Sequence, residues 1–134
     1  MICLDTNVVI GIINGRAPQL EARFRETIGV VPVALPVIAL FELRYGYAKS
    51  HRRVQMEALL GEFLAPGVTI LPFGEEDAAE AGDIRANLEV QGVPIGFYDV
   101  LIAAQARARG AILVTANRRE FERVPGLMVT DWAA

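Results

Sequence analysis

Five short apolar runs, separated by segments with helical spacing, constrain the fold of this chain more than any other feature. We expect strands in these runs, which cover residues 1–4, 30–35, 68–71, 111–114 and 127–129. Helical spacing of apolar residues predicts helices between them, at 6–13, 18–28, 36–48, 52–64, 75–91 and 97–109. Strands that alternate with helices form a parallel sheet with helices on both faces. The sequence therefore predicts an α/β fold in a single domain over residues 1–134.

Composition supports a folded domain and excludes several classes of protein. A chain of 134 residues has the usual size of one domain, and 53% hydrophobic residues are enough for a substantial core. The single cysteine, Cys3, excludes a disulfide scaffold and a cysteine-based zinc site. A net charge of −3 argues against a strongly basic nucleic-acid coat protein.

The distribution of charge also argues against a membrane protein. The longest uncharged stretch, residues 27–41, has 15 residues and contains a glycine and two prolines. A membrane-spanning helix needs about 20 mainly apolar residues. We therefore expect a cytoplasmic protein that binds no membrane, and its apolar excess favours a protein partner such as a second copy of the chain.

Three acidic residues stand out because their local sequence does not account for them fully. Asp5 directly follows the first strand, where open α/β sheets bind ligands, although an aspartate there can also be a helix N-cap. Glu42 lies in an apolar helical segment with no cation three or four residues away, so it is either an ordinary surface residue or a buried carboxylate that needs a cation. Asp99 lies in the first turn of a helix, where the helix dipole favours an anion.

Crowded carboxylates at one edge of a sheet favour a divalent cation. Mg²⁺ prefers carboxylate oxygens, with water and phosphate completing its shell, and such sites serve phosphodiester hydrolysis. Asn117 and Thr115 follow the fourth predicted strand, so they can face the same edge with an amide oxygen and a hydroxyl. The Thr-x-Asn spacing is equally typical of a turn or a cap.

Several segments of the chain resemble the PIN-domain ribonucleases, and within them the VapC toxins of bacterial type II toxin–antitoxin pairs. The matching segments are LDTNVVI at 4–10, FELRYGYAKS at 41–50, GVPIGFYDVLIAAQA at 92–106, LVTANRREFERVPGL at 113–127 and the closing Asp131-Trp132. The resemblance implies a PIN fold with a parallel sheet flanked by helices. It also implies RNA hydrolysis with Mg²⁺ or Mn²⁺, a homodimer, and inhibition by a VapB-type antitoxin.

The same resemblance implies a role for each site residue. Asp5 and Asp99 would be the main metal ligands, and Glu42 would be a third acid that holds the metal or its water. Asn117 stands where many PIN domains have a fourth acid, which implies one well-held metal and a second recruited by substrate. Thr6, Asn7 and Thr115 are supporting candidates.

Basic residues near the site are candidates for RNA binding. All but one of the 13 cationic side chains are arginine, which suits phosphate recognition. Arg118 and Arg119 follow Asn117 closely and would contact the RNA backbone, unless they belong to an ordinary solvated surface.

Two other functions stay open at this point. One is a non-catalytic PIN-like module that binds RNA or protein, and the other is a phosphatase-type α/β domain with Asp5 as nucleophile. The sequence does not identify the RNA, and transfer RNA is an expectation that comes from the family alone.

Overall fold

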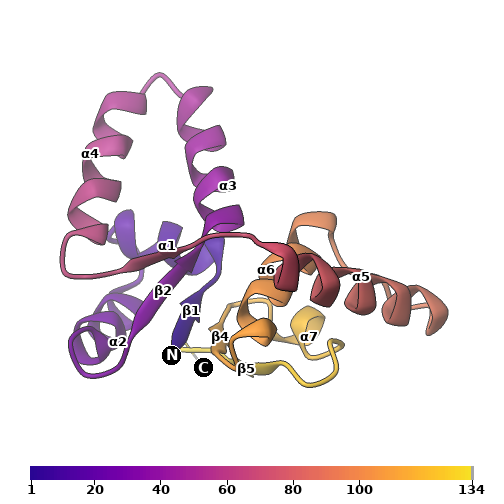
Figure 1. Ribbon diagram of the computed structural model, residues 1–134. Helices are drawn as coiled ribbons and strands as arrows, with labels where there is room; N and C mark the ends of the chain where they lie inside the picture. The colour runs from indigo at the N-terminus through magenta and orange to yellow at the C-terminus, as the bar shows by residue number, and fades with distance from the viewer. Residues whose placement is uncertain (134) are drawn as a thin grey trace.

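The fold is a five-stranded parallel sheet with helices on both faces, as the computed structural model of residues 1–133 shows (Figure 1). The strands are β1 (Ile2–Leu4), β2 (Val33–Pro36), β3 (Thr69–Leu71), β4 (Ile112–Val114) and β5 (Met128–Thr130). The helices are α1 (Thr6–Ile13), α2 (Pro18–Thr27), α3 (Val37–Ala48), α4 (Arg53–Leu64), α5 (Glu75–Val90), α6 (Phe97–Ala108) and α7 (Arg118–Phe121). This architecture confirms the predicted α/β fold.

The strand order β3-β2-β1-β4-β5 places β1 in the centre of the sheet. Its residues Cys3 and Leu4 are fully buried, which explains why this short run is apolar. The chain passes from β1 to β2 on one side and later returns to β4 on the other side. The carboxyl end of β1 is therefore the point where the strand order reverses, and ligands bind at such a point in open α/β sheets.

Many boundaries differ from the sequence prediction by one residue, and three differences have a clear local reason. Residues 30–32 do not extend β2, because the chain turns at Gly29 with a φ of 82° and leaves Val30 and Val31 exposed. Pro36 was expected to open a helix, but it ends β2 and directly precedes α3. The short helix α7 was not predicted, since four residues carry too little periodicity to detect.

Helices α3 and α4 lie antiparallel and project away from the sheet (Figure 1). An ion pair between Arg44 and Glu57, 2.7 Å long, joins them. Stacked rings of Phe24 and Phe63, with centroids 4.8 Å apart, fix α4 to α2. Within the described residues, no helix is long and apolar enough to span a membrane.

Candidate active site

Asp5 lies at the carboxyl end of β1 and is held there by two hydrogen bonds. The backbone N–H of Thr6 donates to Asp5 Oδ1 at 2.8 Å, and Thr115 Oγ1 donates to Asp5 Oδ2 at 2.7 Å. Parallel pairing of β1 with β4 brings Thr115 to this position, because Leu4 is in register with Val114. Asp5 is 4% exposed and Thr115 is fully buried, so this carboxylate is fixed from both sides.

Glu42 reaches the same edge of the sheet from α3. Thr6 Oγ1 donates to Glu42 Oε1 at 2.8 Å, so Thr6 contacts Asp5 through its backbone and Glu42 through its side chain. Glu42 is only partly buried, so it is neither an ordinary surface residue nor a fully buried carboxylate, the two alternatives that the sequence left open. The structure thus connects residues of β1, α1, α3 and β4 through a short chain of hydrogen bonds.

Asp99, in the first turn of α6, lies beside an acid that the sequence analysis missed. The backbone N–H of Gly96 donates to Glu120 Oε1 at 3.0 Å. A side chain at Gly96 would bring its Cβ to 3.1 Å from Asp99 Oδ2 and 3.8 Å from Glu120 Oε1. A side chain at position 96 would therefore press on the carboxylate of Asp99 and would be in ordinary contact with that of Glu120.

Burial, together with repulsion from the neighbouring acids, raises the pKa of Asp99 to about 7. Burial is the largest cause, followed by the negative charges of Glu120 and Asp5, the hydrogen bond with Glu120 and the charge of Glu42. The pKa of Asp5 is also raised, chiefly by burial, while its hydrogen bonds from Thr115 and Thr6 act in the opposite direction.

This group of acids fits a divalent cation by its chemistry. Within residues 1–133, none of the four carboxylates takes part in a salt bridge, so no arginine or lysine compensates their charge. Oxygen donors with uncompensated negative charge are the ligands of hard divalent cations. In the described part of the chain, however, no three potential ligand side chains are close enough together to form a complete metal site.

Asn117 also lies at this edge, but its side chain contacts the acids through the amide nitrogen and not through the amide oxygen. Its backbone N–H donates to Thr115 Oγ1 at 2.9 Å, and its side-chain Nδ2 donates to Glu120 Oε2. Glu120, three residues after Asn117, thus adds a further carboxylate at this edge. The spacing of Asn117 and Glu120, three residues apart after a strand, was the signal available in the sequence.

Among residues 1–133, the remaining candidates form no hydrogen bond or ion pair with these four carboxylates. Arg118 forms an ion pair with Glu122, 2.5 Å long, and both side chains are exposed. This arrangement is typical of an ordinary solvated surface. Arg119 is exposed on the same helix, and Asn7 is exposed on the first turn of α1.

Comparison with known proteins agrees with this fold. The model of the PIN domain family matches residues 2–127, and the chain therefore belongs to this family. PIN-domain nucleases generally use divalent metal ions.

Within the family, the chain is similar to several VapC ribonucleases. The chain is 42% identical to ribonuclease VapC2 of Haemophilus influenzae, with 96% of each chain covered. It is 38% identical to the tRNA(fMet)-specific endonuclease VapC of Shigella flexneri, with 97% of this chain and 96% of that protein covered. A crystal structure of VapBC2 from Rickettsia felis, bound to a promoter DNA fragment, matches with a TM-score of 0.92 and 34% identity over 98% of this chain and 99% of that chain. These matches confirm the resemblance to VapC proteins.

Proposed function

We propose that the chain is a VapC-type toxin, a cytoplasmic Mg²⁺-dependent endoribonuclease that a VapB-type antitoxin inhibits. The observation that carries this proposal is the group of uncompensated carboxylates at the carboxyl end of β1. Asp5 and Asp99 are the main candidates to hold the metal, with Glu42 and Glu120 beside them. The named VapC relatives support a ribonuclease, and the VapBC structure supports the antitoxin partner.

Each residue has a defined part in this reaction. When bound, the cation supplies Lewis acidity that favours attack of water on a phosphodiester. Thr115 and the N–H of Thr6 orient Asp5, and Thr6 Oγ1 orients Glu42. Glu42 is partly exposed and accepts a hydrogen bond from Thr6 Oγ1, and we assign to it the part of orienting or deprotonating the attacking water.

The alternatives from the sequence receive less support. The phosphatase alternative has no counterpart among the named relatives, which are ribonucleases and endonucleases. Four uncompensated carboxylates destabilise the folded state when no cation is bound. A non-catalytic module gives no functional reason for this cost.

Cleavage of RNA by the purified chain tests the proposal. We expect cutting with Mg²⁺, loss of cutting with EDTA, and recovery when Mg²⁺ or Mn²⁺ is restored. Asp5→Asn should lower the rate at least 10²-fold, whereas Glu122→Gln, on the exposed face of α7, should leave it unchanged. Cleavage that survives Asp5→Asn, or that persists in EDTA, would refute the proposed site.

The RNA target, the antitoxin and the oligomeric state need separate measurements. One of the named relatives is a tRNA(fMet)-specific endonuclease, which favours transfer RNA as substrate. Mapping of RNA ends in cells that express the chain tests this, and intact transfer RNA would contradict it. Co-purification with the product of a neighbouring small gene tests for the antitoxin, and light scattering tests for a homodimer.

A further inference from the structure

Gln105, on α6, is a fully buried amide that joins three parts of the fold. Its Nε2 donates to the carbonyl oxygens of Leu71 and Pro72, at 2.9 and 3.0 Å, where β3 ends. Its Oε1 accepts from the backbone N–H of Ile38 at 3.4 Å, in the first turn of α3. Both ends of the amide are thus paired inside the protein, where water cannot replace a lost partner.

The bond to Ile38 supplies a partner that α3 lacks at its N-terminus. The first N–H groups of a helix have no acceptor within the helix, and an N-cap side chain usually provides one. The N-cap of α3 is Pro36, which forms no side-chain cap hydrogen bond. Gln105 therefore caps α3 from another helix, 67 residues further along the sequence.

Ile38 lies one helical turn before Glu42 on the same face of α3. In an α-helix the N–H of residue 42 bonds to the carbonyl oxygen of residue 38, so the two positions move together. Helix α3 projects from the sheet with α4, and its first turn directly follows β2 (Figure 1). A bond that fixes this first turn therefore fixes the direction in which α3 presents Glu42.

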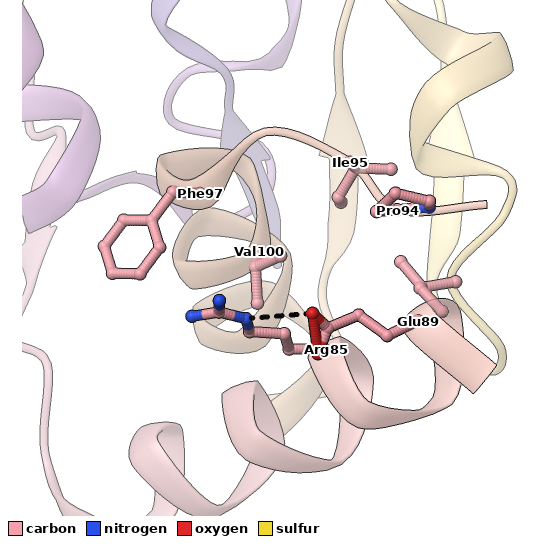
Figure 2. Close-up of a pocket in the computed structure, with 7 residues that line it drawn as sticks. Arg85, Glu89, Pro94, Ile95, Phe97 and Val100 are labelled. Atoms are coloured by element: carbon pink, nitrogen blue, oxygen red, sulfur yellow. Dashed lines mark ion pairs between the residues drawn. The ribbon is translucent and has the colours of Figure 1, made fainter. Parts of the chain in front are cut away.

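Where α6 begins, its packing against α5 is incomplete. A pocket of about 130 Å³ lies between the two helices there, and Val100, the residue after Asp99, lines it (Figure 2). Contact with α5 therefore leaves room at the turn that carries Asp99. The bond from Gln105 to α3 is a second attachment, and it ties α6 directly to the helix of Glu42.

The separation of these two helices matters because the carboxylates are not yet assembled. In the described part of the chain, no three potential ligand side chains are close enough together to hold a metal ion. Binding of a cation then requires carboxylates from β1, α3 and α6 to approach one another. Affinity is lost when the helices that carry them must be ordered in the same step, and it is kept when side chains alone have to move.

We propose that Gln105 is a positioning residue, which fixes Glu42 on α3 relative to Asp99 on α6 and thereby raises the affinity of the site for a divalent cation. The inference rests on the proposed function, in which these carboxylates hold the metal. Gln105 itself bonds to backbone groups and not to the carboxylates, so it acts through α3. The competing explanation is that Gln105 stabilises the fold and nothing more.

Titration calorimetry with Mn²⁺, in the absence of RNA, tests the inference. Gln105→Met keeps an unbranched side chain of similar length but removes both polar atoms. We expect the affinity for Mn²⁺ to fall about 10-fold, the lower end of the range for residues that orient metal ligands. In cleavage assays the same variant should need about 10-fold more Mg²⁺ for its half-maximal rate, while KM for RNA at saturating Mg²⁺ stays the same.

Asp77→Ala is the control for a general loss of stability. Among residues 1–133, Asp77 bonds to Gly74 and Arg109 and forms no hydrogen bond with α3. This variant should be easier to unfold in urea and should keep its affinity for Mn²⁺ within about twofold. Equal Mn²⁺ affinity in Gln105→Met and in the unsubstituted chain, or an equal loss of affinity in Asp77→Ala, would overturn the inference.

A double-mutant cycle shows whether Gln105 acts through Glu42. Glu42→Gln should weaken Mn²⁺ binding because it removes a candidate ligand. If the part of Gln105 is to place Glu42, then Gln105→Met added to Glu42→Gln should cause a further loss of about twofold or less. A further loss of about 10-fold would show that Gln105 acts elsewhere, and the inference would be wrong.

Gln105→Asn covers the case in which Gln105→Met has no native circular dichroism spectrum. Its amide is shorter and cannot reach α3 and β3 at the same time, so Mn²⁺ affinity should again fall. Failure of both variants to fold would assign Gln105 to the stability of the fold instead.

The proposed function is judged separately, by whether the unsubstituted chain cuts RNA. An unsubstituted chain that binds no Mn²⁺ would overturn the inference about Gln105. A chain that binds Mn²⁺ with the expected loss in Gln105→Met, but cuts no RNA, would contradict the proposed function and leave the inference standing.

Discussion

Replacement of Glu120 by glutamine tests the electrostatics of the site most directly. Oxygens of Asp99 and Glu120 lie 3.1 and 3.8 Å from the Cβ position of residue 96, so they are at most about 7 Å apart. Two unit charges at that separation repel by about 2 kcal/mol when the effective dielectric constant is about 20. Since Asp99 is only partly buried, solvent screening reduces this to about 1 kcal/mol.

The sign of the effect follows from proton linkage. The pKa of Asp99 is about 7 in the folded chain and near its ordinary value of 3.8 when unfolded, so the folded state holds more protons between these values. The free energy of unfolding of the metal-free protein therefore falls as the pH rises from 5 to 7.5. In Glu120→Gln the pKa of Asp99 is lower, and we expect this fall to be about 1 kcal/mol smaller.

Urea unfolding in EDTA at pH values of about 5.0, 6.0, 7.0 and 7.5 measures how the free energy of unfolding changes with pH across the titration of Asp99. The slope is the result to compare, because loss of an acceptor for Asn117 shifts the stability of the variant equally at every pH. Glu122→Gln removes a charge two residues away, in an exposed ion pair, and should keep the slope of the unsubstituted protein. An equal slope in Glu120→Gln, or stability of the unsubstituted protein that rises from pH 5 to 7.5, would refute the reasoning.

Two further substitutions separate the parts of the structure that build the site from those that stabilise the fold. Thr115→Val removes the hydroxyl that donates to Asp5 and should lower cleavage about 10- to 100-fold, as kcat measurements with native circular dichroism would show. Asp77→Ala removes the carboxylate that accepts from the backbone N–H of Gly74 at the start of α5 and breaks the ion pair with Arg109, 2.6 Å long, and should cost about 2–4 kcal/mol in urea unfolding. Arg25→Ala, in an exposed pair on α2, should cost about 0.5 kcal/mol or less, and a cost equal to that of Asp77→Ala would contradict the argument from burial.

Much of the fold could be predicted because its elements are encoded locally. The runs that became strands are apolar and short, and Gly92 and Gly110 follow helices with a positive φ that glycine adopts readily. What local sequence does not encode is contact between distant segments. Gln105 is fully buried in α6, where its Nε2 donates to the carbonyl oxygens of Leu71 and Pro72, and no pattern around residue 105 indicates this.

Glu120 was missed for the same reason. Three arginines lie near it in the sequence, and such a composition is typical of an ordinary surface ion pair. In the structure Glu122 forms the surface ion pair with Arg118. Glu120 instead accepts hydrogen bonds from the backbone N–H of Gly96 and from the side chain of Asn117. Two acids with the same local composition thus differ because one of them lies on the side of α7 that faces α6.

The local and the functional interpretations of Asp5 and Thr115 do not exclude each other. Asp5 is the N-cap of α1, as its position predicted, and Thr115 accepts a turn-type hydrogen bond from Asn117. These same contacts fix the orientation of both side chains, so that Thr115 can donate to Asp5 at 2.7 Å. A carboxylate that is both buried and charged needs such fixed donors before any cation binds, since it cannot rely on water. Helix capping and turn formation therefore supply the rigidity that a metal-binding carboxylate requires at this edge of the sheet.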